Sequence, residues 1–239
     1  MIRVVTFKWT DPAYRFNHLF RYGAEHVNRW ARAVRRNLTL AHELVVVADD
    51  PTGITEDVRI VPLWDDLREL GGCYTRLRAF APDMAEIIGK RFVWMDLDAI
   101  IVGSLDPLFS REEDFVVWSN GFSGNPYCGS MVMMTAGARR EVWDDFDPET
   151  SPQAARRYVG TDQAWIAHRL GPNEATWTRG DGVLSRYDIG ILNGMTRGTY
   201  KLRPRPLPGN ARLVFFHGPC DPSLPDIQAA FPWIAQNWS

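Results

Sequence analysis

The chain has 239 residues, of which 45% are hydrophobic and 23% charged, and its formal net charge is -2. This length allows one large domain with a substantial core, and the composition is ordinary for a globular protein. A net charge this close to zero argues against nucleic-acid or anionic-membrane binding driven by overall charge. Cys73, Cys128 and Cys220 are odd in number and widely spread, which is not a disulfide framework.

No apolar stretch approaches the length of a membrane-spanning helix. The start of the chain lacks the charged head, apolar core and cleavage site of a secretory signal. Together with the cysteine usage, these features predict a protein of the cytoplasm without an integral membrane segment. Four arginines, Arg29, Arg32, Arg35 and Arg36, cluster on one segment, and we interpret them as a solvated helix face rather than as a basic groove.

Strand-like and helix-like segments alternate along the chain. In order, the pattern predicts a strand over 2–7, an amphipathic helix over 19–38, a strand over 44–48 closed by a turn at 49–53, and a short strand over 58–61. A helix over 73–81 that Pro82 stops, strands over 92–95, 115–118 and 130–135, helices near 138–146 and 162–170, and a strand over 212–216 follow. This alternation predicts the α/β class, with a Rossmann-like, mainly parallel sheet and helices on both faces.

No internal repeat or low-complexity linker divides the chain. Residues 1–239 are therefore predicted to form a single domain, with the proline-rich stretch 203–210 as an ordered connection and a C-terminal tail from about residue 220. In sheets of this kind, ligands bind beyond the carboxyl ends of the strands. Residues 6–9, 49–50, 96–98 and 217 all stand at such ends, which predicts a binding site at this edge.

The apolar run 91–95 leads directly to Asp96 and Asp98, which are separated by one residue. On a strand, residues two apart project to the same side, so both carboxylates could face one ion. The alternative is a turn in which one aspartate caps local backbone amides. Because a second apolar run, 99–102, follows at once, the charges lie in a buried context that calls for a partner or a metal. The pattern favours Mn²⁺ or Mg²⁺ and a phosphorylated substrate.

A histidine, His217, stands at the tip of the late apolar strand. It could supply a nitrogen ligand to the same cation, or it could be a hydrogen-bonded core histidine. Gly218 would allow the backbone to approach a phosphate closely. Cys220 lies near His217, but two residues do not make a zinc site, and Cys220 is interpreted as a packed thiol.

Three motifs follow one another in a characteristic order: Asp96-Leu97-Asp98 after an apolar strand, Gly160-Thr161-Asp162-Gln163 before a helix, and His217-Gly218-Pro219 after a late strand. In this order they resemble GT-A glycosyltransferases, and in particular the glycogenin-like and bacterial lipopolysaccharide galactosyltransferase family. Residues 7–9 and 34–38 also resemble bacterial members, so the similarity spans nearly the whole chain.

The resemblance implies a single GT-A domain that uses a nucleotide-sugar donor, a UDP-sugar, with Mn²⁺ or Mg²⁺ bound by Asp96, Asp98 and His217. The cation would bridge the diphosphate and stabilise the charge of the leaving nucleotide. The donor site would further include a set of residues from the strand ends and from the helix over 73–81, namely Thr6, Phe7, Lys8, Asp49 or Asp50, and Arg76. Trp9, at a strand end beside this site, is a candidate for stacking on the donor.

The resemblance also gives Asp162 and Gln163 roles in a retaining reaction. Asp162 would bind donor-sugar hydroxyls, and Gln163 would lie near the reacting carbon. The alternative is a helix N-cap made by Thr161 or Asp162. An inverting enzyme would instead need a carboxylate base, for which Asp181 and Asp188 are candidates.

The chain departs from the family pattern at two places. The lysine that usually follows the late His-Gly is replaced, because residues 220–222 are Cys-Asp-Pro, so this diphosphate contact is either missing or supplied by Lys8, Lys201 or Arg203. The usual asparagine is replaced in the stretch 127–130, where Ser130 is the candidate substitute.

Other function classes remain open at this point. A haloacid-dehalogenase-type phosphatase also carries Asp-x-Asp after an apolar strand, and a non-catalytic protein could bind a nucleotide-sugar. The acceptor is also open: glycan, lipid-linked glycan, protein and modified nucleic acid are the candidates.

Overall fold

The structure is a computed structural model that describes residues 1–10, 22–119, 121, 124–193, 200–217 and 220–239. Its centre is a seven-stranded sheet in the order β3-β2-β1-β4-β7-β6-β8. The strands are β1 (Ile2–Lys8), β2 (His42–Ala48), β3 (Arg59–Pro62), β4 (Arg91–Met95), β6 (Phe115–Trp118), β7 (Cys128–Thr135) and β8 (Thr176–Trp177). Strand β7 is antiparallel to both of its neighbours, and all other neighbouring strands are parallel. The predicted α/β class with a mainly parallel sheet is confirmed.

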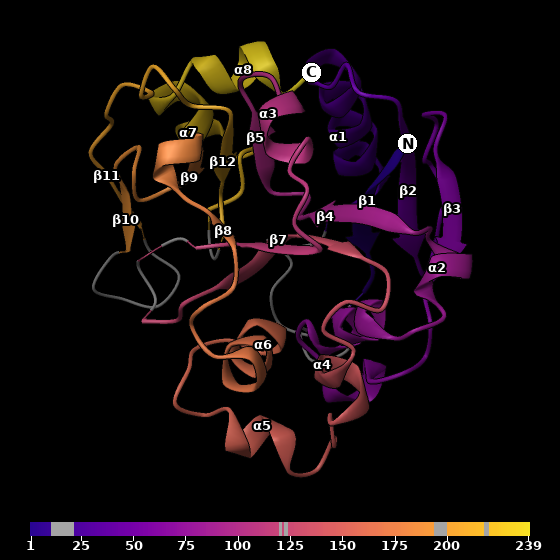
Figure 1. The fold of residues 1–239 in the computed structure, drawn as a ribbon. Helices are drawn as coiled ribbons and strands as arrows, with labels where there is room; N and C mark the ends of the chain where they lie inside the picture. Colours follow the sequence, from indigo (N-terminus) through magenta and orange to yellow (C-terminus); the bar gives the residue numbers. More distant parts are fainter. Residues whose placement is uncertain (11–21, 120, 122–123, 194–199, 218–219) are drawn as a thin grey trace.

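Both faces of the central sheet are buried, which explains why its strands read as continuous apolar runs. Val4 and Val93 belong to the core on the side of helix α1 (Ala24–Asn37). Val5 and Trp94 belong to the core on the opposite side. That side is covered by the 3-10 helix η4 (Tyr74–Phe80) and by α2 (Met84–Ile87), α4 (Glu141–Asp144) and α6 (Asp162–Leu170), with α5 (Ser151–Ala154) beside α6. Figure 1 shows α1 above the sheet and α4, α5 and α6 below it.

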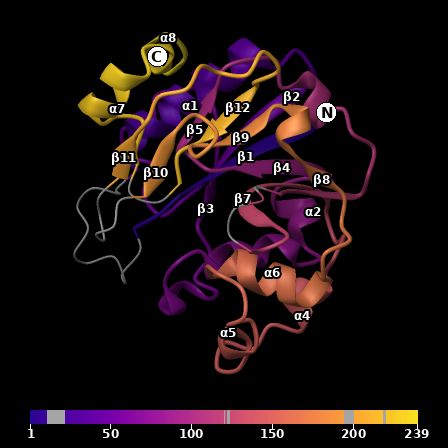
Figure 2. The same ribbon diagram turned by 90° about the vertical axis from the view of Figure 1, so that its left-hand side faces the viewer.

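A second, smaller sheet packs on the α1 side of the central sheet. It contains β5 (Ala99–Ile101), β12 (Leu213–Phe215) and β9 (Val183–Ser185), in that order. Its inner residues join the α1-side core, while the outer residues Ile100 and Val214 pack in a third core with α7 (Pro225–Ala230) and α8 (Trp233–Asn237). Figure 2 shows α7 and α8 beside α1. The segment from residue 220, predicted as a tail, therefore contains two helices that bury apolar side chains.

The remaining elements are short. They are η3 (Arg68–Leu70), α3 (Asp106–Phe109), η5 (Arg179–Asp181), and the antiparallel pair β10 (Ile191–Asn193) and β11 (Tyr200–Leu202). Strands β5, β8, β9, β10 and β11 were not predicted, because two or three residues are too few to show a period.

Three predicted helices differ from the structure. Helix α1 begins at Ala24, since Gly23 is extended and its N–H donates to His26 Nδ1; of the earlier predicted start, residues 19–21 lie outside the described residues. The segment 73–81 forms a 3-10 helix, and Ala81, in front of Pro82, is extended as proline requires. The predicted helix at 138–146 is reduced to the four residues of α4.

The arginines of α1 have local partners. Arg32 and Arg35 both pair with Glu56, and Arg36 donates to the carbonyls of Asn237 and Ser239. These contacts support the interpretation of a solvated, salt-bridged helix face. The three cysteines are free, and within the described ranges no helix is long and apolar enough to cross a membrane.

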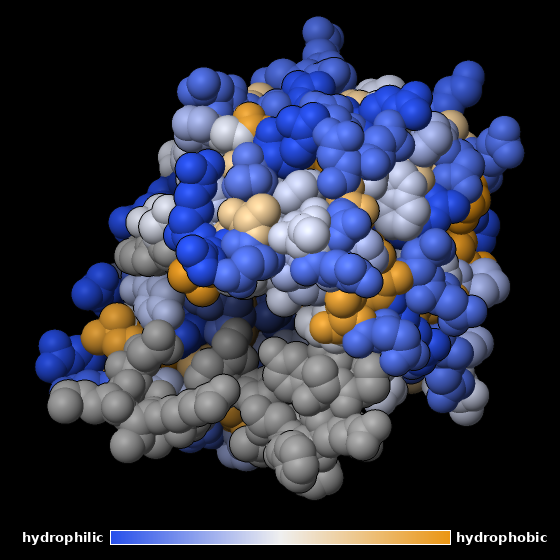
Figure 3. All heavy atoms as spheres, turned by 90° about the horizontal axis from the view of Figure 1, so that it is seen from below, coloured by the Kyte–Doolittle hydropathy of each residue, from blue (hydrophilic) through white to orange (hydrophobic). Residues whose placement is uncertain are grey.

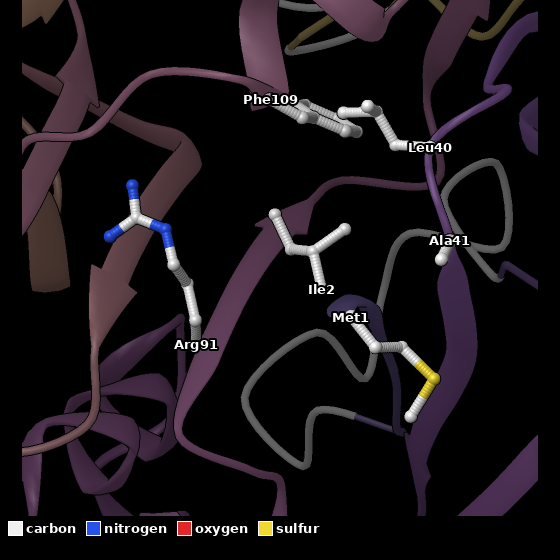
Figure 4. A pocket seen from close by; sticks show the side chains of 6 residues that line it. All are labelled: Met1, Ile2, Leu40, Ala41, Arg91 and Phe109. Carbon is white, nitrogen blue, oxygen red and sulfur yellow. The ribbon is translucent and has the colours of Figure 1, made fainter.

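Among the described residues, the exposed large hydrophobic side chains are Met1, Ile60, Leu70 and Val159. The face seen from below in Figure 3 is mainly hydrophilic, with scattered hydrophobic residues. A cavity of about 270 Å³ lies at the amino ends of β1 and β4, and its lining residues are Met1, Ile2, Leu40, Ala41, Arg91 and Phe109 (Figure 4). Because ligands of such sheets bind at the carboxyl ends, this cavity lies at the wrong edge for the predicted site.

Candidate functional site

The carboxyl ends of β1, β2 and β4 meet at one edge of the central sheet, because these strands are parallel neighbours. Lys8 ends β1, while Asp49 and Asp96 directly follow β2 and β4. Lys8 Nζ donates to the backbone carbonyl of Asp50 over 2.6 Å and lies 3.7 Å from Asp49 Oδ1. The predicted convergence of polar residues at this edge is therefore present.

The side chains of Thr6 and Phe7 belong to the core. Thr6 is fully buried, and its hydroxyl donates to the carbonyl of Met95 over 3.0 Å. Phe7 packs edge-on against Trp94 and Trp9. Of the predicted residues at the end of β1, Lys8 and the half-buried Trp9 are the ones whose side chains are placed to meet a ligand.

Asp49 and Asp50 differ in their environments. Asp49 is largely buried, and its Oδ2 accepts from the backbone N–H of Thr10 and from Arg68. Asp50 is exposed, and hydrogen bonds from Thr52 lower the pKa of its carboxyl. A ligand at this edge would meet Asp50 in solvent and Asp49 as a fixed, buried acceptor.

Arg76 links two acidic residues that are far apart in the sequence. It projects from η4, and its guanidinium pairs with Asp96, after β4, and with Asp162, at the start of α6, over 2.8 Å in the second case. Its side chain is only 5% exposed, so it lies inside the protein and not on an exposed helix face. Burial acts to lower the pKa of Arg76, but Asp162 and Asp96 outweigh it and raise that pKa well above its usual range.

Asp96 and Asp98 do not lie on a strand. Strand β4 ends at Met95, and the chain turns through Asp96 and Asp98 into β5, which belongs to the smaller sheet. Asp96 therefore meets Arg76, whereas Asp98 meets the hydroxyl of Tyr22, 3.5 Å from its Oδ2. The strand alternation assumed from the sequence does not apply, because these residues form a turn between two sheets.

The carboxyl of Asp98 is the more perturbed of the two. It is 6% exposed, and its Oδ1 has no hydrogen-bond partner among the described residues. Burial, followed by the charges of Asp96 and Asp221, raises the pKa of Asp98 well above its usual range. Burial also raises the pKa of Asp96, although Arg76 and the side chain of Ser130 oppose this. Buried carboxylates in this state are suited to binding a cation.

Ser130 and Gly129, on β7, stand behind the carboxylates. The backbone carbonyl of Ser130 accepts from the N–H of Asp96 over 2.9 Å. A Cβ added to Gly129 would lie 2.8 Å from Asp162 Oδ2, so glycine is required for the close approach of this carboxylate. Ser130 thus supports Asp96 through its backbone carbonyl.

Asp162 and Gln163 open helix α6. Asp162 is 2% exposed and is held by Arg76, so its carboxylate is fixed rather than free to rotate. The side-chain amide of Gln163 donates to the carbonyl of Val159 over 2.8 Å and accepts from the N–H of Gly129 over 3.3 Å. Thr161 is the N-cap residue of α6 but makes no side-chain cap hydrogen bond, which removes the strongest support for the capping alternative.

His217 follows β12. The chain before it contacts the acidic turn, residues 96–98, because the backbone N–H of Phe216 donates to the carbonyl of Asp98 over 3.0 Å. Its Nε2 lies 2.7 Å from the hydroxyl of Ser185. Burial, and then the charge of Arg186, lower its pKa to about 4, so the imidazole is neutral at neutral pH. A neutral imidazole is the form that can bind a metal. Gly218 lies outside the described residues.

In the part of the chain that the structure describes, no group of three His, Cys, Asp or Glu side chains is arranged to hold a metal ion. The chemistry of the acidic turn nevertheless fits a hard cation, because Asp98 Oδ1 is buried without a hydrogen-bond partner beside a second carboxylate. His217 fits less well, since Ser185 occupies its Nε2.

The sequence analysis missed several residues of this region. Tyr22, just before α1, contacts Asp98, and His26, in the first turn of α1, pairs with Asp221 from the segment after β12. Trp118 and Trp177 are fully buried in the core on the α1 side. The only available signal was the departure from the family pattern at residues 220–222.

Comparison with solved structures shows which fold this is. The chain matches the galactosyltransferase LgtC, crystallised with donor and acceptor sugar analogues, with a TM-score of 0.58 and 14% identity, over 99% of this chain and 96% of LgtC. It matches the glycosyltransferase GlyE of Streptococcus pneumoniae TIGR4 with a TM-score of 0.63 and 10% identity, over 100% of this chain and 62% of GlyE. A third match is the bifunctional glycosyltransferase WbbM, with a TM-score of 0.54 and 9% identity, over 99% of this chain and 50% of WbbM.

No protein-family model and no curated sequence matches the chain. The structural matches show that the chain has the GT-A fold of glycosyltransferases, as the order of the three motifs predicted.

Proposed function

We propose that this protein is a metal-dependent glycosyltransferase that moves a sugar from a nucleotide-sugar, a UDP-sugar, to an acceptor. The observation that carries the proposal is the ion-paired bridge Asp96–Arg76–Asp162, set at the carboxyl edge of a GT-A sheet. A nucleotide-sugar presents a diphosphate and several sugar hydroxyls. On this proposal, Arg76 would hold Asp96 for the side of the diphosphate and Asp162 for the side of the sugar.

On this proposal Asp96, Asp98 and His217 would hold Mn²⁺ or Mg²⁺. When bound, the cation would neutralise the diphosphate and the charge of the leaving nucleotide. Asp98 has a buried oxygen without a hydrogen-bond partner among the described residues, as such an ion requires. The imidazole of His217 is neutral, which is the form that can bind a metal. The position of Lys8 beside Asp49 and Asp50 would put a positive charge at the edge where the nucleotide enters.

The sugar would lie near the start of α6. Asp162 is held by Arg76, so its carboxylate can accept hydrogen bonds from sugar hydroxyls without first losing side-chain freedom. Gln163 would lie beside the reacting carbon, and retention of configuration follows from this assignment. The inverting alternative has less support, because Asp188 accepts from the N–H of Ser185 and pairs with Arg179.

The two alternative functions are weaker. The phosphatase would use Asp96 as a nucleophile, but Arg76 pairs with this carboxylate, and the fold is that of glycosyltransferases. A non-catalytic binding protein would make the same contacts with a donor. Only a measurement of turnover distinguishes it from an enzyme.

A donor screen tests the proposal. UDP release from a panel of UDP-sugars is measured with and without Mn²⁺, for the wild-type protein and for the Asp162→Asn variant. The expected result is Mn²⁺-dependent release that falls at least about 100-fold in the variant, a loss of roughly 3 kcal/mol of transition-state stabilisation. Tight donor binding without release would favour the non-catalytic binder, and phosphate release from a simple phosphoester would favour the phosphatase.

A further inference from the structure

The sequence between Asp188 and Asp221 contains basic residues but no aspartate or glutamate. The lysine and arginines of this stretch are Arg197, Lys201, Arg203, Arg205 and Arg212, of which Arg197 lies outside the described residues. The whole chain, in contrast, has a formal net charge of -2. A local excess of positive charge on a slightly acidic protein attracts anions to one part of its surface.

Three of these cations occupy alternate positions of one extended segment. Lys201 lies on β11, and Arg203 and Arg205 follow this strand. Tyr200 and Leu202 project to the other side and pack in the third core, which α7 also lines (Figure 2). Because side chains of an extended chain alternate between its two sides, the three cations project into solvent, and all three are exposed. Lys201, Arg203 and Arg205 are called the basic stripe below.

The backbone of the basic stripe is fixed by its neighbours. The N–H of Arg203 donates to the carbonyl of Gly190 over 2.8 Å, and that of Arg205 donates to the carbonyl of Ile189 over 3.0 Å. A Cβ added to Gly190 would lie 1.8 Å from the carbonyl oxygen of Arg203, so this close approach requires glycine. Pro204 keeps the residue before it extended. A ligand would therefore meet a preformed row of charges, which lowers the entropic cost of binding.

The charges of the basic stripe have no partner within the described residues. None of its three side chains forms an ion pair or a hydrogen bond with another described residue. Other surface arginines do have such partners, since Arg139 pairs with Glu174 and Arg169 with Asp145. The row of cations is therefore free to bind an anionic molecule from solution.

The basic stripe begins close to the candidate site. Ile189, whose carbonyl accepts from the N–H of Arg205, is two residues away from Tyr187. The ring of Tyr187 packs edge-on against the ring of His217, with their centroids 5.2 Å apart. The Arg205 end of the stripe therefore belongs to the segment that borders the site, and Lys201 lies further along the hairpin of β10 and β11.

We infer that the basic stripe binds the acceptor and that this acceptor is an anionic glycan, a sugar chain with carboxylate, phosphate or sulfate groups. The inference rests on the proposed function and extends it to the second substrate. Guanidinium groups bind such anions through paired N–H donors. Alternate residues of a strand are about 7 Å apart, so the stripe presents its charges along a line. A glycan with repeated anionic groups matches this line and offers hydroxyls that can accept a sugar.

A membrane surface fits the basic stripe less well. Stable attachment to a membrane takes an apolar or lipid anchor in addition to basic residues. The exposed large hydrophobic side chains of the described residues, Met1, Ile60, Leu70 and Val159, all belong to other segments. The stripe therefore lacks a neighbouring apolar anchor among the described residues, and lipid binding is an outcome that the test must separate.

The test is the affinity of the full chain, without donor, for dextran, carboxymethyl dextran and dextran sulfate, measured by microscale thermophoresis at about 50 mM and about 200 mM salt. A triple variant replaces the basic stripe by glutamines. Its matched control replaces Arg32, Arg35 and Arg140 by glutamine, which removes the same charge from surface residues that pair with carboxylates. A third protein, Arg203→Lys with Arg205→Lys, keeps the charge of the stripe.

The expected result is that the wild-type protein binds an anionic dextran but not the neutral one, and binds it more weakly at the higher salt concentration. The affinity should fall at least about tenfold in the glutamine variant of the stripe and stay within about threefold in the other two proteins. An equal loss in the matched control would show that binding depends on net charge and would overturn the inference. Absence of binding to either anionic dextran, with UDP release intact, would overturn the inference and leave the proposed function standing.

Three further outcomes would also count against the inference. Tighter stripe-dependent binding to phosphatidylglycerol vesicles or to single-stranded DNA than to any dextran would assign the stripe to that partner. An equal loss of UDP affinity in the glutamine variant would place the stripe at the donor diphosphate. Stripe-dependent binding of an anionic dextran without UDP release from any donor would overturn the proposed function, and the role of the glycan as acceptor with it.

Discussion

Replacing Arg76 by methionine should strongly destabilise the fold. Methionine is apolar and of similar length, so it fills the space but leaves Asp96 and Asp162 without their counter-charge. Removing one partner of a buried ion pair costs about 3–5 kcal/mol. The Arg76 and Asp162 side chains are 5% and 3% exposed, but the Asp96 side chain is 27% exposed and can be partly hydrated, so we expect a loss of roughly 4 kcal/mol.

The loss can be measured as a change in Tm. For a chain of this size each kcal/mol corresponds to about 2–4 °C, so the Tm of Arg76→Met should fall by roughly 8–16 °C. Arg78→Met is the matched control on the same helix, because Arg78 pairs with the half-exposed carboxylates of Asp83 and Asp66. Such pairs contribute at most about 1 kcal/mol, so its Tm should fall by no more than about 4 °C.

A second variant isolates the cause. Combining Arg76→Met with Asp162→Asn removes one of the two carboxylate charges that have lost their ion-pair partner, and should recover part of the lost stability. A fall in Tm of less than about 3 °C for Arg76→Met, or an equal fall in the Arg78→Met control, would show that the carboxylates do not depend on this guanidinium, and would contradict the proposed importance of the Asp96–Arg76–Asp162 bridge.

Three further substitutions have expected outcomes. Gly129→Ala should displace the Asp162 carboxylate and lower UDP release at least about tenfold, whereas Gly209→Ala, where a Cβ meets no atom within 4 Å, should leave release unchanged. Below its ordinary pKa of 6.5, His217 is protonated in the unfolded chain but stays neutral in the folded one down to about pH 4. The free energy of unfolding of the metal-free wild-type protein should therefore fall by up to roughly 3 kcal/mol, relative to His217→Gln, as the pH is lowered from 6.5 to about 4. Chemical denaturation at several pH values measures this difference. The same pH dependence in both proteins would contradict the burial of this imidazole. Gln163→Glu keeps an acceptor for the Gly129 N–H but can no longer donate to the Val159 carbonyl. The free energy of unfolding should therefore fall by about 1 kcal/mol in chemical denaturation, and an unchanged value would contradict that hydrogen bond.

Most strands of the central sheet, and the edge at which its ligand would bind, could be predicted from the sequence. Strands such as 2–7 and 44–48 are buried on both faces, so their apolar residues are consecutive and can be recognised without tertiary information. Since parallel strands end at one edge, the convergence of Lys8, Asp49 and Asp96 also followed from the pattern. The short strands of the smaller sheet carry no such period, and the two helices beyond residue 220 were not anticipated.

Which side chains meet at that edge could not be predicted from the sequence, because it depends on how distant segments pack. Asp96 and Asp98 are two residues apart, yet they face different partners because the chain changes sheets between them. The partners, Arg76 on one side and Tyr22 with Asp221 on the other, are separated from the acidic turn along the chain, and no local spacing encodes contacts of that range. Local periodicity is set by backbone geometry, whereas the pairing of charges across the site depends on how the packed layers bring distant segments together.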